Sequence, residues 1–218
     1  MRKLLIGVAI LVAIVAGAYL VSTRTAIVQD ALLARGAAAR MAQPVQEPPD
    51  GGIRVFLCGT ASPLPAPGRA QACGAVLVDE RVFLVDAGIG SAGVAIAGRV
   101  PLERLRGVLL THFHSDHISG IADFNLASWA RGRPEPLQII GPEGVERVVS
   151  GLNRMYELDR GYRVEHHGAD LLPPSLHVMQ AWTIELGVIL EQDGLVVTAF
   201  AVDHAPVAPA VGYRFDYG

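Results

Sequence analysis

The amino-acid sequence predicts a mixed α/β fold. Three observations predict it: a length of 218 residues, a composition that is 51% hydrophobic and 18% charged, and strand-like runs with helices interspersed later in the chain. The length suits one domain plus a tail, and the composition is globular rather than disordered. Clustered strands favour a mixed sheet over a simple strand–helix–strand repeat. The formal net charge of −3 gives no global basic field for nucleic acid, and a local basic face stays open.

The N-terminus is a separate segment. Arg2 and Lys3 precede the uncharged apolar residues 4–21, and these eighteen residues would extend ~27 Å as a helix, close to the thickness of a thin bilayer. They are either a signal peptide cleaved near Ala16-Gly17-Ala18 or an uncleaved anchor. The apolar run continues past that cleavage site, which favours the anchor. We therefore expect residues 1–21 to be a membrane segment that places the following domain on the periplasmic or extracellular side.

A connecting segment at residues 22–52 is expected to join this N-terminus to a globular domain at residues 53–218. Residues 22–40 are rich in alanine and predict a continuing helix. Residues 41–52 contain three prolines and a glycine pair, which predicts a linker.

The first half of the domain is expected to be rich in strands. Residues 53–57 form a short β-type run that leads into a Gly-Thr loop. Two apolar runs, residues 75–78 and 82–85, are split by three charged residues, which predicts a hairpin. Residues 107–110 form a further apolar strand that leads directly into a polar motif.

The second half is expected to mix helices and strands. Helices are predicted at residues 118–129 and at residues 145–158, where apolar side chains recur at helical spacing. Residues 160–174 are expected to be a loop. An Asp193-Gly194 turn predicts a hairpin between two strands. The strands expected in this half are at residues 137–140, 188–191, 195–202 and 211–215.

Two cysteines, Cys58 and Cys73, lie near the ends of predicted strands. No Cys-x-x-Cys pair is present, which excludes thiolate zinc fingers and thioredoxin-type redox chemistry. The pair is either a disulfide, as in exported domains, or two small buried side chains.

Four side chains that bind metals fall within six residues, directly after the strand at residues 107–110. They are His112, His114, Asp116 and His117. His112 and His114 are two residues apart, so an extended backbone points them to the same side. Imidazole and carboxylate without thiolate fit zinc, with manganese and iron as the other candidates. Three of the seven histidines occupy this window, which makes a chance cluster a poor explanation.

A zinc site needs a further imidazole from elsewhere in the chain. His204 is the best candidate, because it also follows an apolar strand. Asp203, its neighbour, is interpreted as an exposed turn residue. His166-His167 and His177 are interpreted as solvated surface histidines, although the pair could also line a substrate cleft.

Asp86 ends the strand at residues 82–85 and precedes Ala87-Gly88. A carboxylate in this place either orients a metal-binding histidine through its second ring nitrogen or caps the turn through its own backbone. The expected nearness of the motif strand favours the first role.

The His-x-His-x-Asp-His pattern after a strand resembles the hallmark of the metallo-β-lactamase superfamily. Three further stretches, residues 56–63, 83–88 and 204–214, resemble the ribonuclease Z and arylsulfatase-like branch. The resemblance covers residues 53–218 and implies an αββα sandwich of the metallo-β-lactamase fold.

The resemblance also implies a ligand set for two zinc ions. His112, His114 and His204 would hold one ion, and Asp116 and His117 the other. The branch's bridging aspartate and final histidine have no counterpart in this sequence. We therefore expect the chain to be truncated, with an incomplete second half of the fold and an incomplete second metal site.

The reaction implied is hydrolysis by a metal-activated hydroxide, with Asp116 as a ligand and as the acceptor of the nucleophile's proton. We predict a zinc-dependent hydrolase of phosphodiester or related ester bonds, in small molecules or nucleotides. The alternatives are a lactone or sulfate-ester hydrolase of the same fold, and a non-catalytic, membrane-tethered metal-binding domain. Expected export and the slightly acidic charge argue against tRNA as the substrate. The sequence does not indicate an oligomeric state.

Overall fold

The computed structural model describes residues 2–41, 44–64 and 66–218, which form two compact units, Met1–Pro44 and Val45–Gly218. The first unit consists of two helices, α1 (Arg2–Arg24) and α2 (Ala26–Met41). Residues 44–52 contain neither helix nor strand, as expected of a linker; residues 42–43 of that predicted linker lie outside the described residues.

The predicted membrane anchor at residues 4–21 is wrong. In the part of the chain that the structure describes, no helix is both long enough and apolar enough to cross a bilayer. The apolar run has eighteen residues, at the short end of the about 17–25 residues that cross a bilayer core. The expected placement of the following domain on the periplasmic or extracellular side was derived from that anchor and loses its basis with it.

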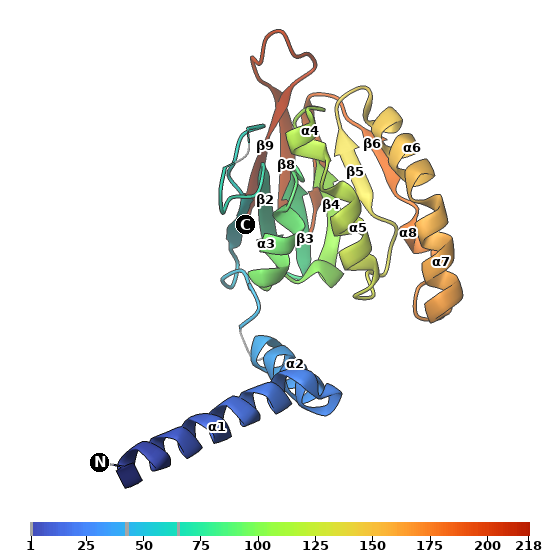
Figure 1. Ribbon diagram of the computed structural model, residues 1–218. Helices are drawn as coiled ribbons and strands as arrows, with labels where there is room; N and C mark the ends of the chain where they lie inside the picture. The colour runs from blue at the N-terminus through green and yellow to red at the C-terminus, as the bar shows by residue number, and fades with distance from the viewer. Residues whose placement is uncertain (1, 42–43, 65) are drawn as a thin grey trace. The chain divides into compact units, whose positions relative to one another are not determined.

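The second unit contains two sheets (Figure 1). The larger sheet has six strands in sequence order, antiparallel from β1 to β3 and parallel from β3 to β6. The smaller sheet is the antiparallel set β7-β8-β9. The strands are β1 (Ile53–Gly59), β2 (Cys73–Val78), β3 (Arg81–Val85), β4 (Leu105–Leu109), β5 (Gln138–Gly141), β6 (Gln180–Thr183), β7 (Gly187–Gln192), β8 (Leu195–Ala201) and β9 (Val211–Tyr217).

Helices are interspersed between these strands, and the layout is the mixed α/β arrangement that the sequence predicts. They are α3 (Ser91–Ala97), the short 3-10 helix η1 (Leu102–Arg104), α4 (Ser115–Ile118), α5 (Ile121–Trp129), α6 (Val145–Met155), α7 (Glu157–His167) and α8 (Pro174–His177).

Several elements differ from the sequence prediction, α7 and β6 among them. The expected loop at residues 160–174 is helical as far as His167, because α7 continues from Glu157. This helix is mostly polar and buries no residue, and an Asp159–Arg163 ion pair one turn apart supports it. Strand β6 was also not expected, because all four of its residues are exposed and show no alternation of apolar and polar side chains.

The core has two layers, because the central strands of the larger sheet, β2 to β5, are buried on both faces. Leu77 and Leu84 point to the helices and pack with α3, α5 and α6. Their neighbours Val76 and Phe83 point the other way and pack with the smaller sheet. Strands buried on both faces appear as continuous apolar runs, as at residues 75–78. The described residues therefore form three layers, helices, sheet and sheet, which are visible in Figure 1.

The turns and the cysteines also follow from the sequence. Asp79 (φ 48°) begins the β2–β3 turn, and Asp193 (φ 49°) with Gly194 (φ 77°) forms the β7–β8 turn; all three have the left-handed backbone that such hairpins need. Cys58 and Cys73 are buried and form a disulfide with a Cα–Cα distance of 5.0 Å, which decides between the two interpretations of the pair.

Candidate metal centre

The polar motif leaves the sheet at the carboxyl end of β4. Strand β3 runs parallel to β4 and ends beside it, where the amide N–H of Asp86 donates to the carbonyl of Leu109 at 2.9 Å. Parallel pairing therefore brings the end of one strand, Asp86, next to the residues that follow the other, Thr111 and His112.

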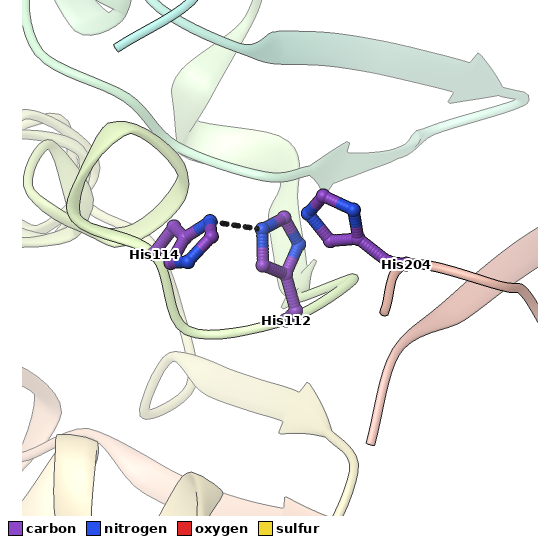
Figure 2. Close-up of side chains that lie close together, drawn as sticks. All are labelled: His112, His114 and His204. Carbon is purple, nitrogen blue, oxygen red and sulfur yellow. Dashed lines mark hydrogen bonds between the residues drawn. The ribbon is translucent and has the colours of Figure 1, made fainter. Parts of the chain in front are cut away.

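Three imidazoles converge at this edge of the sheet, from His112, His114 and His204 (Figure 2). One ring nitrogen from each lies within 4.8 Å of the other two. Nε2 of His112 and Nδ1 of His114 are 3.0 Å apart. Two nitrogens bound to one tetrahedral zinc at ~2.0–2.1 Å each would be ~3.3 Å apart, so the donor set and the spacing fit a zinc ion.

His204 reaches the motif from the β8–β9 connection. A backbone bond from Val202 N to Ala210 O, 3.1 Å, closes this connection at its base. The amide of Val211 donates to the carbonyl of Thr111 at 2.9 Å, and the Tyr213 hydroxyl donates to the carbonyl of Leu110 at 2.8 Å. The start of β9 is thus tied to the two residues that precede His112.

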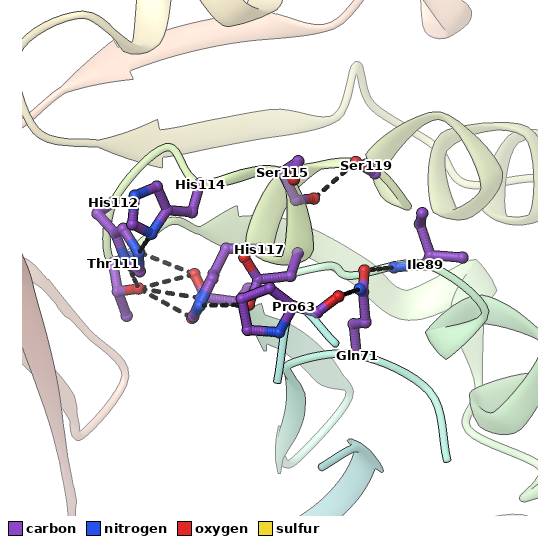
Figure 3. A network of polar contacts seen from close by, with 11 residues as sticks. Pro63, Gln71, Ile89, Thr111, His112, His114, Ser115, His117 and Ser119 are labelled. Carbon is purple, nitrogen blue, oxygen red and sulfur yellow. Dashed lines mark hydrogen bonds and ion pairs between the residues drawn. The ribbon is translucent and has the colours of Figure 1, made fainter. Parts of the chain in front are cut away.

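Asp86 is the centre of a buried network beside the histidines, part of which is labelled in Figure 3. Its carboxylate accepts from the Thr111 amide at 2.9 Å, from the Thr111 hydroxyl at 2.9 Å and from Nδ1 of His117 at 2.7 Å. An ionised carboxylate can only accept, so the one hydroxyl proton of Thr111 goes to Asp86. The Thr111 oxygen must then accept from Nδ1–H of His112, 3.0 Å away. This leaves the lone pair of His112 on Nε2, the nitrogen that faces His114.

Thr111 was not among the residues expected to act at the site. Its hydroxyl connects Asp86 to His112, so the carboxylate orients that histidine through an intervening hydroxyl group and contacts His117 directly. A hydroxyl side chain between an apolar strand and the first motif histidine is the signal that would have found it.

Asp116 and His117 occupy the short helix α4, next to the three histidines but outside the group they form. Asp116 is buried, and its Oδ2 lies 3.4 Å from Nε2 of His117. Because Nδ1 of His117 donates to Asp86, a neutral His117 presents a lone pair on Nε2 to the Asp116 carboxylate. Two acceptors that face each other need a proton or a cation between them.

The histidine pKa values follow from these surroundings. Burial, helped by the neighbouring imidazoles of His117, His114 and His204, lowers the pKa of His112 below 6.5 and keeps the ring neutral, as a metal ligand must be. Burial alone would also lower the pKa of His117. The hydrogen bond to Asp86 and the charges of Asp86 and Asp116 outweigh it and raise that pKa above 6.5.

Close backbone contact fixes the Asp86 turn against α4. The amide of Ala87 donates to the carbonyl of His117 at 2.7 Å, and a side chain at Gly88 would collide with the carbonyl of Asp116, 2.2 Å from an added Cβ. Glycine is therefore required at the end of Asp86-Ala87-Gly88 because the helix that carries Asp116 and His117 packs directly on it.

The remaining predicted residues fall outside the cluster. Asp203 is exposed, and its carboxylate accepts from the Ala205 amide at 3.1 Å, as expected of a turn residue. The exposed His166 and His167 end α7. The surface position expected for His177 is wrong: it is 2% exposed, and its ring packs 4.7 Å from that of Trp129.

A cleft of about 650 Å³ adjoins the cluster, and His204 is one of its lining residues. The walls come from the β5–α6, β6–β7 and β8–β9 connections. A ligand held at the histidines therefore has space for a substituent on this side.

Comparison with known sequences gives a consistent match. Residues 66–205 match the metallo-beta-lactamase superfamily. Ribonuclease Z of Mycobacterium marinum is 38% identical over 168 residues, which are 76% of this chain and 59% of that protein. Ribonuclease Z of Mycolicibacterium paratuberculosis is also 38% identical with the same coverage. The chain thus spans 59% of the length of these relatives.

Solved structures share the fold at lower sequence identity. The short form of human tRNase Z superposes with a TM-score of 0.58 at 20% identity, covering 75% of this chain and 64% of that one. A diphosphatase from the PhnP family superposes with a TM-score of 0.55 at 18% identity, covering 75% and 62%. At these identities the likeness concerns the fold alone.

Proposed function

The chain belongs to the metallo-beta-lactamase superfamily, and on that premise we propose that it is a zinc-dependent hydrolase of phosphodiester or related ester bonds. Membership in this superfamily implies bound metal ions, and the histidine cluster offers a group of side chains that could hold one. The observation that carries the proposal is the convergence of His112, His114 and His204 from two separate segments of the chain.

The proposed ligands divide into two sets. His112, His114 and His204 hold one zinc ion, supported by the spacing of their nitrogens and by the lone pair that the Asp86–Thr111 network leaves on Nε2 of His112. Asp116 and His117 hold a second ion, supported by the opposed acceptors of these two side chains. Three imidazoles plus water complete a four-coordinate zinc, whereas two protein ligands do not. We therefore expect the first ion to bind tightly and the second to exchange readily.

When bound, the metal ions make hydroxide available from water near neutral pH and stabilise the charge that develops on the ester. The residues of the chain position the reaction and move its proton. Asp86 holds the tautomers of His112 and His117 through their Nδ1 atoms. Asp116 is the proposed catalytic residue, because its buried carboxylate lies at the motif and accepts the proton that the nucleophile releases.

The phosphodiester is proposed as the bond cleaved because the relatives 38% identical to this chain are ribonuclease Z proteins. One argument against tRNA as the substrate, the expected export of the domain, no longer stands. The other, the slightly acidic net charge of −3, remains.

Hydrolysis of bis(4-nitrophenyl) phosphate by the purified chain, measured with and without added zinc, tests this function. We expect activity that a chelator removes and zinc restores, with one equivalent of zinc retained after dialysis. His166→Ala, in an exposed histidine outside the cluster, is the matched control and should keep that activity.

Two outcomes would contradict the proposal. If the chain hydrolyses 4-nitrophenyl sulfate or a lactone faster than bis(4-nitrophenyl) phosphate, it is a hydrolase of another ester class. Tight zinc binding without turnover of any of the three substrates would identify a non-catalytic metal-binding domain.

A further inference from the structure

The cleft beside His204 is lined mostly by apolar side chains, with a few acidic ones among them. Four of its lining side chains are polar, those of Glu143, Glu185, Asp203 and His204, and all the others are apolar. Among the described residues that line it there is no lysine and no arginine.

The apolar part of the wall is open to a ligand. Leu186 is 60% exposed and Val202 is 41% exposed, and both line the cleft. Large apolar side chains that solvent reaches inside a concave site gain free energy when an apolar group covers them. An aryl or alkyl substituent in the cleft would cover these two.

The charged part of the wall acts against anions. Glu143, Glu185 and Asp203 are all exposed and carry carboxylates on the same cleft. A negatively charged substituent placed there would face three like charges, and the described lining residues include no lysine or arginine to balance them. A phosphate of a polynucleotide chain is such a substituent.

We propose that this cleft binds an uncharged, largely apolar substituent of the ester and discriminates against a substituent that carries its own negative charge. The inference rests on the proposed function, because it names the substrate class of the same site. His204 makes the connection, since it belongs to the histidine cluster and also lines the cleft. A group attached to an ester held at the histidines therefore reaches the cleft.

Two symmetrical diesters test the inference, because the same group enters the cleft whichever oxygen leaves. The zinc-loaded chain should hydrolyse diphenyl phosphate with a kcat/KM at least about 10-fold higher than that for bis(4-carboxyphenyl) phosphate. Glu143→Lys combined with Glu185→Lys should narrow that ratio by on the order of 5-fold or more, through faster turnover of the carboxylated diester. Asp203 is left in place because it caps its own turn.

Glu165→Lys is the matched control, since it makes the same charge change at an exposed position on α7 outside the cleft. It should leave the ratio of the two diesters unchanged. Equal rates for the two diesters in the original chain, or a ratio that the double variant does not alter, would overturn the inference.

A binding measurement separates failure of the inference from failure of the proposed function. Titration of the metal-free chain with phenol should shift the amide resonances of Leu186 and Val202, and 4-hydroxybenzoate should shift them far less. Phenol binding with no hydrolysis of either diester would refute the proposed function and leave the chemical preference of the cleft intact. Equal shifts with both phenols, or no shift in the cleft with either, would refute that preference.

Discussion

The two segments that supply the three histidines are held in different ways. His112 follows β4, is 5% exposed, and takes its orientation from a buried carboxylate through the Thr111 hydroxyl. His204 lies in the exposed β8–β9 connection, where the Asp203 carboxylate accepts a hydrogen bond from the Ala205 amide within the local turn. This connection is fixed at its ends, through Val202 and Val211, and the carbonyl of His204 accepts only a local bond from the Val207 amide at 2.8 Å.

The difference shows where the site is preorganised. Removal of a side chain that orients a metal-binding histidine through its second ring nitrogen typically lowers metal affinity by about 10–100-fold. His112 and His117 have such a partner, in Thr111 and Asp86, whereas the described contacts of His204 include none. The position of His204 depends instead on how firmly β9 is attached to the end of β4.

Removal of the first motif histidine should have the largest effect. His112→Ala removes the proposed ligand that the buried network orients. We therefore expect a large loss of zinc affinity and a fall of at least about 10³-fold in kcat/KM for bis(4-nitrophenyl) phosphate. His204→Ala should lower affinity less, because His112 and His114 remain as a preorganised pair 3.0 Å apart. Competition against a chromogenic chelator measures both affinities. Zinc binding by His112→Ala at the original affinity would show that the motif is not the metal site.

The carboxylate behind the motif should matter next. Asp86→Asn keeps the size of the side chain but replaces one acceptor oxygen with an NH₂ donor, so it cannot accept all three hydrogen bonds. Zinc affinity should therefore fall by about 10–100-fold. Asp203→Asn is the matched change in the other segment, and asparagine can still accept from the Ala205 amide. It should leave the affinity nearly unchanged. Equal losses in the two variants would mean that the two segments are not supported differently.

The attachment of β9 should contribute a smaller effect. Tyr213→Phe removes the hydroxyl that donates to Leu110 O and leaves that carbonyl without its partner, which should lower the free energy of unfolding by about 1–3 kcal/mol. Zinc affinity should fall several-fold, because the start of β9 anchors His204. Tyr217→Phe is the control, since its hydroxyl binds the Asp79 carboxylate at the exposed end of the strand. If both variants bind zinc equally well, β9 does not position His204.

A buried histidine outside both segments should affect stability and not the site. Burial, together with the charge of Arg160, lowers the pKa of His177 from 6.5 to about 4. The neutral ring is favoured in the folded state, so the stability it contributes is complete above pH 6.5 and is lost as the pH falls towards 4, by up to about 3 kcal/mol.

Denaturant unfolding at pH 7.5 and pH 5 measures this loss. His177→Gln should show a smaller difference between the two pH values than the original chain, with unchanged zinc affinity at pH 7.5. His166→Gln, in an exposed histidine, should keep the original difference. An identical pH dependence in all three proteins would contradict the assignment to His177.

The sequence predicted the parts of the site that depend on strand ends. The motif histidines after β4 and Asp86 after its parallel neighbour β3 were placed together by a general property of parallel strands, and the structure brings them together. His204 was singled out because a further imidazole was needed and it also follows an apolar strand; that strand, β8, lies in the smaller sheet, and the structure brings His204 to His112 and His114. The hairpin turns at Asp79 and Asp193 were predictable for a similar reason, because left-handed turn residues have a local signature.

The parts that depend on tertiary contact were not predictable in this way. Nothing local distinguishes His177 from a surface histidine, and its burial against Trp129 comes from the packing of α8 on α5. Thr111 acts through a partner 25 residues away in the chain, and α7 is mostly polar and buries no residue. The membrane prediction failed because it rested on the apolar character of a run only just long enough for a thin bilayer.

The central claim is that three imidazoles from two unlike segments bind one zinc ion. Anomalous diffraction at the zinc edge, from crystals of the zinc-loaded chain, tests it most directly. We predict a zinc peak within ~2.0–2.1 Å of Nε2 of His112 and of one ring nitrogen each of His114 and His204. A zinc peak at another place, or a His204 ring that faces away from the ion, would contradict the account.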